Sequence, residues 1–245
     1  AGKQVSFTAS GNVTSSGKPV VLNSDGTVTE VSSSSVLNGT VSNFLSASGA
    51  FSAVAYDTTN NQGLVVYRDN NAAIKGRIIT VDSSNNITYG TETTILSMAN
   101  TADTTAVYDS THQRYVVMFR DGSSYGQART LSPSGTGGSA TFTVGNNTYF
   151  PVSATNDIRT GFIDSCFDPD TGQVIVAFAD TTNSNHFYMS VGEVRTSPED
   201  IQWGTAVAVD TGGACSSFSV TYDTTANRVL ALWELDGTSG KAVVT

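Results

Sequence analysis

The stretch AVAYDTTNNQGLVVYRD, residues 53–69, joins two short apolar runs through a polar turn, and it decides the fold prediction. An aromatic residue precedes its first Asp, and a second aromatic follows that Asp by ten positions. The same frame returns in VYDSTHQRYVVMFRD, CFDPDTGQVIVAFAD and TYDTTANRVLALWEL. The repeat positions are Tyr56, Asp57 and Tyr67; Tyr108, Asp109 and Phe119; Phe167, Asp168 and Phe178; Tyr222, Asp223 and Trp233. The four Asp residues are 52, 59 and 55 positions apart, which indicates a repeat with linkers of unequal length.

Each copy predicts a small antiparallel sheet. The two runs are rich in β-branched and aromatic residues and flank Thr, Asn, Asp and Gly, which is typical of a β-hairpin. Hairpins are expected at 51–69, 104–121, 161–180 and 217–236. A third strand is expected at 75–81, 126–131, 187–194 and 240–245, and a fourth, in the first three copies, at 87–96, 140–150 and 201–209.

Sheets of four short strands that recur every 52 to 59 residues are typical of propeller blades. The predicted fold class is therefore all-β: a β-propeller of about four four-stranded antiparallel blades over residues 36–245. Residues 1–35 stand outside the repeat and predict a small β module or attachment arm, with a turn at Asp25–Gly26.

The fourth copy stops after its third strand. SVLNGTVSNFLSA (35–47) resembles the fourth-strand segment ITYGTETTILSMA (87–99), so the N-terminal stretch could complete the last blade and close a ring. A fragment of a longer chain with more blades is the alternative, and counting repeats does not separate the two.

Composition narrows the function classes. Only 13% of the 245 residues are charged, and the formal charge of -9 disfavours a phosphate backbone, so nucleic acid is not an expected partner. No run of about 18 apolar residues occurs, so no membrane insertion is expected. Cys166 and Cys215 are too few for a disulfide scaffold and lack a Cys-x-x-Cys spacing, while a bridge between them stays open.

The repeated Asp residues have two interpretations. As turn residues, their carboxylates accept backbone N–H groups, and the flanking aromatics lie between neighbouring sheets. As metal ligands, they would rely on DPDTG (168–172), which resembles the start of a calcium loop. The other copies lack its second carboxylate, and no Glu closes a twelve-residue loop. We therefore expect a structural role, with no metal and no cofactor.

Familiar catalytic motifs are absent from the sequence, and no catalytic residue is predicted. His112 lies in a predicted turn, and His186 is the candidate for a nucleophile triad. A glycosidase needs only two carboxylates, and the candidates outside the repeat are Asp157, Asp164 and Glu193.

Binding is expected where the copies depart from one another, in 132–152 and 154–165. The candidate contact residues are Tyr149, Phe150, Asn156, Asp157, Arg159, His186 and Tyr188. Aromatic, Asn, Asp and Arg groups suit sugar or protein recognition. That these residues merely fill longer loops is the alternative.

The opening QVSFTASGNVTSSGKPVVLNSDGTVTEV (4–31), the VAYD…VVYRD hairpins and the YGT or WGT fourth strands resemble virion proteins of tailed, particularly marine, bacteriophages. The resemblance implies a non-enzymatic tail fibre, spike or capsid decoration protein on the virion surface. Its implied partners are other virion proteins or a host surface glycan, in a homo-oligomer or larger assembly. A secreted propeller lectin or glycoside hydrolase acting on polysaccharide, or a cell-surface filament subunit, is the alternative.

Overall fold

The computed structural model describes residues 8–9, 20–30, 42–45, 49–71, 73–98, 101–150, 157–237 and 239–245. Contacts divide the chain into two compact units, residues 1–40 and 41–245, whereas the sequence predicts a boundary after residue 35. Within the described residues, no helix has the length and apolar character needed to cross a membrane.

The first unit contains a two-stranded antiparallel sheet made of β1 (Val20–Leu22) and β2 (Val28–Glu30). Asp25 shapes the turn between them, because its Oδ1 accepts hydrogen bonds from the N and Oγ1 of Thr27 at 2.9 and 2.7 Å. Gly26 follows with φ +80°, a conformation that glycine adopts without steric cost. The turn lies at the predicted Asp-Gly pair.

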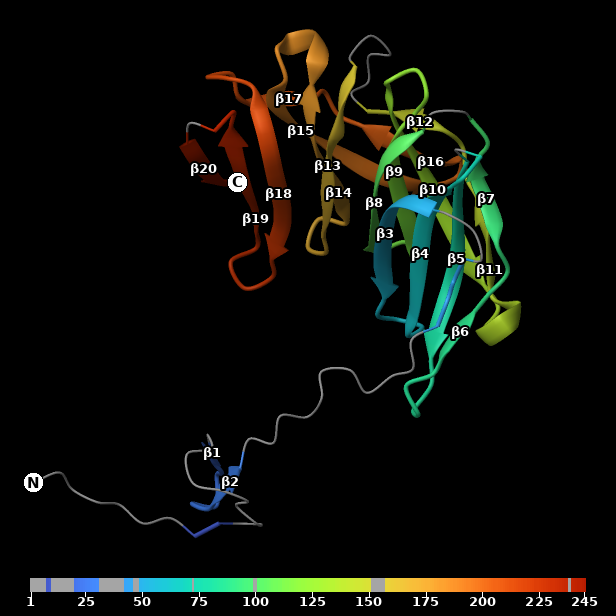
Figure 1. Cartoon of the computed structure of the whole chain (residues 1–245), viewed down its shortest axis with the longest axis vertical. Helices are drawn as coiled ribbons and strands as arrows, with labels where there is room; N and C mark the ends of the chain where they lie inside the picture. Colours follow the sequence, from blue (N-terminus) through green and yellow to red (C-terminus); the bar gives the residue numbers. More distant parts are fainter. Residues whose placement is uncertain are drawn as a thin grey trace, which may run out of the picture. The chain divides into compact units, whose positions relative to one another are not determined.

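The second unit is all-β and consists of four antiparallel sheets, the blades of a propeller (Figure 1). Blade I contains β3 (Gly49–Asp57), β4 (Gln62–Asp69), β5 (Ile74–Val81), β6 (Ile87–Tyr89) and β7 (Thr93–Leu96). Blade II contains β8 (Ala102–Asp109), β9 (Arg114–Arg120), β10 (Gly126–Ser134), β11 (Thr141–Val144) and β12 (Thr148–Tyr149). Blade III contains β13 (Ile158–Asp168), β14 (Gln173–Asp180), β15 (His186–Thr196), β16 (Glu199–Trp203) and β17 (Val207–Asp210). Blade IV contains β18 (Cys215–Asp223), β19 (Arg228–Leu235) and β20 (Ser239–Val244).

The outer edges of blades I to III differ from the prediction. In blades I to III the fourth strand is two short strands that both pair with the third strand, so each sheet has five. In blade I the break lies at Gly90 of the YGT motif, whose N–H donates to Ile78 O at 2.7 Å while Thr91 N donates to Ala140 O of blade II at 2.8 Å. The break thus directs one backbone N–H within the sheet and the next toward the neighbouring blade.

The blades follow one another in an open arc. The first strands form its inner side, because β3 contacts β8, β8 contacts β13 and β13 contacts β18 (Figure 1). β20 and β7 lie near opposite ends of the arc in Figure 1. The predicted closure by 35–47 falls partly outside the described residues, and the described part, 42–45, lies against blade I, where Phe44 packs on Tyr67.

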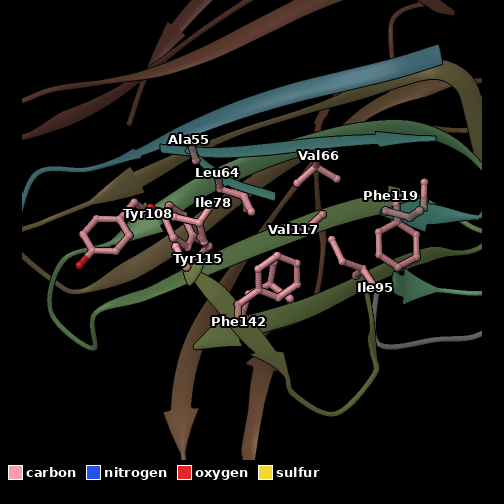
Figure 2. Packing of buried hydrophobic residues seen from close by; sticks show 13 residues of the cluster. Ala55, Leu64, Val66, Ile78, Ile95, Tyr108, Tyr115, Val117, Phe119 and Phe142 are labelled. Atoms are coloured by element: carbon pink, nitrogen blue, oxygen red, sulfur yellow. The ribbon is translucent and has the colours of Figure 1, made fainter. Parts of the chain in front are cut away.

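The alternation of β-strand side chains explains how the blades adhere. Side chains seven and nine positions after the repeat Asp face the next blade, and those eight and ten positions after it face the previous one. Leu64 and Val66 of blade I meet Val117 and Phe119 of blade II in this way (Figure 2). Two further clusters join blades II and III and blades III and IV. Stability therefore comes mainly from apolar area removed from water between blades, at roughly 25 cal/mol per Å².

Candidate binding surface

Each repeat Asp organises the turn after the first strand of its blade. Thr59 N and Asn60 N donate to Asp57 Oδ1 at 2.8 and 2.9 Å, and Asn60 Nδ2 donates to Oδ2 at 2.8 Å. The same pair of backbone bonds recurs at Asp109, Asp168 and Asp223. Burial alone would raise the pKa of Asp57, but the hydrogen bonds from Asn60 and Thr59 outweigh it and lower the pKa below the usual value. These bonds agree with the predicted turn role.

A second set of Asp residues, which the sequence analysis missed, lies twelve positions later in blades I to III. Asp69 Oδ1 accepts from Asn71 N at 2.9 Å and Ala73 N at 3.0 Å. Asp121 accepts the equivalent pair of backbone N–H groups, whereas Asp180 accepts from Thr182 N and from the Asn183 side chain; all three Asp residues are buried. The signal was present in the sequence, since YRD, FRD and FAD end the second strand of three copies.

The repeat aromatics divide into two groups. The second aromatics Tyr67, Phe119, Phe178 and Trp233 are all buried, with exposures of 1%, 0%, 0% and 7%. The first aromatics of blades II to IV pack in the clusters shared with the preceding blade. Tyr56 differs from the prediction because it is 55% exposed: among the described residues no blade precedes blade I to cover it.

Two of the candidate contact residues come together around Tyr125, at the start of β10. The Tyr149 and Tyr125 rings meet edge to face at 6.3 Å, and Asp157 pairs with Tyr125 as an antiparallel β-bridge. Asp157 O accepts from Thr181 N and Oγ1 at 2.8 and 2.9 Å, and Asp157 N donates to Thr182 Oγ1 at 3.1 Å. Tyr149 is 39% exposed and Asp157 is exposed. The half-buried Tyr125 and the exposed Tyr149 and Asp157 are called here the tyrosine platform. Its Asp157 is held through backbone hydrogen bonds.

Other candidates lie elsewhere. Phe150 is fully buried between blades II and III, 5.2 Å from the Trp203 ring, so the prediction of a surface contact was wrong for this residue. Its apolar ring gains more from the core than from solvent exposure. Asn156 lies outside the described residues.

Three further candidates are half-buried on blade III. Arg159 points to blade IV, where its Nη1 donates to Cys215 O at 2.6 Å, and its guanidinium lies 4.4 Å from the Phe162 ring centre. Tyr188 stacks on Phe178 at 5.9 Å, and His186 starts β15 opposite Asp180. These three residues are not part of the tyrosine platform.

The carboxylates considered for glycosidase chemistry have separate environments. Asp164 Oδ2 accepts from Ser219 Oγ and Val220 N, both at 2.9 Å, and so joins blade III to blade IV. Glu193 is exposed on β15, opposite Gln173 and Gln202 of its own sheet. Over the residues that the structure describes, no group of three or more His, Cys, Asp or Glu side chains is placed to hold a metal ion. Asp170 of DPDTG instead accepts a 2.8 Å hydrogen bond from Tyr222 of blade IV.

Asp103 is an unusual buried carboxylate on the inner strand of blade II. It is 6% exposed, its φ is +47°, and it is the extra residue of a β-bulge in β8. Desolvation raises its pKa, although Gly161 N–H and the charges of Arg120 and Arg68 oppose the rise. Its Oδ2 has no hydrogen-bond partner among the described residues. Sequence periodicity cannot reveal such a residue, because the bulge breaks the alternation.

The two arginines near Asp103 join successive blades. Arg68 Nη1 of blade I donates to Thr101 O at 2.7 Å, just before the first strand of blade II. Arg120 Nε of blade II donates to Ile158 O at 2.8 Å, at the start of blade III. These charge-assisted bonds fix the first strand of each following blade.

Both cysteines are free and buried in the cluster between blades III and IV. Burial raises the pKa of the Cys166 thiol to about 12 and that of Cys215 to about 11. These thiols are therefore packing groups rather than nucleophiles.

No family model matches the chain, and no curated protein matches it. Among solved structures, the periplasmic gluconolactonase PpgL of Pseudomonas aeruginosa has a TM-score of 0.50 at 11% identity, with 80% of this chain and 56% of that chain covered. The exo-β-1,3-galactanase 1,3Gal43A of Clostridium thermocellum has a TM-score of 0.48 at 10% identity, covering 79% and 45%. Sqt1 of Chaetomium thermophilum has a TM-score of 0.47 at 13% identity, covering 78% and 43%.

The chain thus spans about half the length of the structures it matches. At such low identity the likeness is one of fold. The chain has the β-propeller architecture.

Proposed function

We propose that the chain is a non-enzymatic structural and adhesion component of a bacteriophage virion, which presents the tyrosine platform to a glycan of the host surface. The virion role rests on the sequence resemblance described above. The adhesion role rests on the platform itself.

The observation that carries the adhesion role is the grouping of the exposed Tyr149 and Asp157 around the half-buried Tyr125. Three hydrogen bonds hold the Asp157 backbone to Thr181 and Thr182, and an edge-to-face contact holds the Tyr149 ring. Aromatic rings offer an apolar face for the C–H groups of a sugar, while a carboxylate accepts hydrogen bonds from its hydroxyls. Pre-organised groups lose little conformational entropy on binding, which favours affinity.

The use of carboxylates as framework supports a non-catalytic role. Asp57, Asp109, Asp168 and Asp223 hold turns, and Asp164 joins two blades. A carboxylate engaged by several N–H and O–H donors is a poor general acid, because protonation would break those bonds. In this proposal, the rigid blades hold the loops in fixed positions for binding.

Binding to purified bacterial surface polysaccharides, measured by calorimetry, tests the adhesion role. Tyr149→Ala and Asp157→Asn should each weaken binding without lowering the melting temperature, since both side chains are exposed. Leu22→Ala is the control, because Leu22 is an exposed apolar residue of the first unit, outside the blades. Unchanged affinity in the platform variants would contradict the proposed site.

An assay for polysaccharide cleavage distinguishes adhesion from hydrolysis. The wild-type chain should release no reducing ends from the polysaccharides it binds. Release that is abolished by Asp157→Asn or Glu193→Gln would replace this proposal with the glycoside hydrolase alternative. Labelling of phage particles with an antibody to the chain should decorate their surface, and unlabelled particles would contradict the virion role.

A further inference from the structure

The outer face of blade IV has the residue pattern that blades I to III use to bind a following blade. Leu230 and Leu232 lie seven and nine positions after Asp223. In the other blades these positions are at most 4% exposed, and they are Leu64 and Val66, Val116 and Met118, and Ile175 and Ala177. Leu232 is 50% exposed and Val244, opposite Leu230, is 61% exposed. A shallow hollow of about 620 Å³ lies on this face, lined partly by Ser219, Leu232 and Ala242.

Blade I has the complementary pattern. Val54 and Tyr56 lie three and one positions before Asp57 and are 64% and 55% exposed. Their counterparts in blade IV, Val220 and Tyr222, pack in the cluster shared with blade III. The first strand of blade I therefore presents side chains of the kind that pack on a preceding blade.

The outer edge of blade IV, at β20, is also unpaired among the described strands. β20 pairs with β19, and no other described strand pairs with it. Between blades II and III, the outer strand β16 lies against β10, where Thr130 is fully buried. On β15 of blade III, the residue equivalent to Thr130 is Val191, which is 42% exposed. It lines a cleft of about 460 Å³ with Met189, Val229 and Thr245, where the outer strand of blade IV would lie.

Residues 42–45, which form no strand themselves, cover the corresponding place at the other end of the arc. The Phe44 ring lies 5.4 Å from that of Tyr67, and Ser42 Oγ lies 2.6 Å from Tyr89 OH. Ile95 of β7 is in the same cluster as Phe119, the blade II equivalent of Tyr67, and the two appear together in Figure 2. β7 is an outer strand of blade I and covers Phe119 of blade II. Residues 42–45 cover Tyr67, the equivalent residue of blade I. They therefore lie where the outer edge of a blade preceding blade I would lie.

We propose that two copies of this chain associate head to tail, with blade I and residues 42–45 of one copy seated on blade IV and β20 of the other. Each junction repeats the packing already present between blades. Because the two surfaces differ and lie at opposite ends of one arc, two copies related by a twofold axis form two identical junctions. The result is a ring of eight blades without exposed end faces. This inference does not depend on the proposed glycan binding.

The mass of the purified chain, measured by light scattering during size-exclusion chromatography, tests the association. Wild type should elute with twice the 25.5 kDa of one chain. Leu232→Asp and Tyr56→Asp should each shift it to the single-chain mass, with retained circular dichroism, because each places a charge in an apolar junction. Tyr149→Asp is the control, since it alters an exposed aromatic away from both end faces and should leave the dimer intact.

Mixing the two variants distinguishes head-to-tail from head-to-head contact. A Leu232→Asp copy keeps its blade I face and a Tyr56→Asp copy keeps its blade IV face, so the mixture should recover dimers through one intact junction. A wild-type chain that stays at the single-chain mass at every concentration overturns the proposal. So does a mass that grows without limit, or a mixture that recovers no dimer.

Discussion

Nδ1 of His112 lies 2.6 Å from Oδ2 of Asp109, while the other carboxylate oxygen of Asp109 accepts two backbone N–H groups of the same turn. The histidine completes the hydrogen bonding of a fully buried carboxylate. His112, which the sequence places in a predicted turn, is thus part of the hydrogen-bonded framework of that turn.

Asp109→Ala should lower the free energy of unfolding by about 1–3 kcal/mol, because it removes a buried carboxylate and leaves two part-buried N–H groups without their acceptor. Urea unfolding measures this change. Asp223→Ala is the matched control: Asp223 makes the same two backbone bonds but is exposed, so water can replace its carboxylate and the loss should be smaller. Equal losses of unfolding free energy in the two variants would show that burial of the carboxylate does not determine its contribution to stability.

Acid should destabilise the chain in a defined range. The Lys241 ammonium, 2.7 Å from Asp210, is the main cause that lowers the pKa of Asp210 to about 2, and hydrogen bonds lower the pKa of Asp57 and Asp69 despite burial. Groups with a lowered folded pKa stabilise the fold above their usual pKa, and this contribution is lost as the pH falls through the folded value. The melting temperature should therefore drop between about pH 4 and pH 2. Lys241→Met should move the drop to higher pH, and an unchanged profile would contradict this assignment.

Asp103→Asn should raise the melting temperature at pH 8 more than at pH 4. The pKa of Asp103 is raised, so its contribution is favourable below the folded pKa and becomes unfavourable as the pH rises through it. An amide carries no charge to desolvate. Differential scanning calorimetry at the two pH values is the measurement, and an equal change at both would exclude the carboxylate as the cause.

The cysteines should resist alkylation in the folded chain. With pKa values raised to about 12 and about 11 by burial, Cys166 and Cys215 present almost no thiolate at pH 8. Iodoacetamide labelling followed by mass spectrometry should show slow modification in buffer and rapid modification in guanidinium chloride. Rapid labelling of either thiol in the folded chain would show that the junction between blades III and IV opens.

Gly90→Ala should destabilise the junction between blades I and II. A Cβ at this position would lie 2.2 Å from Ala140 O, a backbone atom that cannot move without the strand. Crowding of this kind costs roughly 1–3 kcal/mol. Gly138→Ala is the control in the same unit, because a Cβ there meets no atom within 4 Å. A similar melting temperature for both variants would contradict the close approach.

The hairpins and blades could be predicted from the sequence because their signals are local. The eleven residues from Asp57 to Tyr67 contain the turn, the second strand up to its aromatic residue and the buried ring, and the frame recurs three times. The split of the outer strand at Gly90 depends on hydrogen bonds to a different blade, which no local pattern reports.

Less of the candidate binding surface could be predicted from the sequence. Tyr149 and Phe150 are neighbours in the sequence, yet strand alternation exposes one and buries the other. Tyr125 was missed because it joins Asp157 only through a bridge between blades. Asp103 was missed because its bulge interrupts the period-two pattern.

The arginine bonds from one blade to the next have a consequence for how the chain evolves. Arg68 and Arg120 each bond to the chain at the start of the next blade, so part of the support for a blade comes from the blade before it. Duplication of a whole unit, with its arginine and its hairpin, would insert a module whose two sides already match the surfaces it meets. Gain or loss of whole blades during evolution would therefore preserve the contacts between blades, whereas gain or loss of a single strand would not.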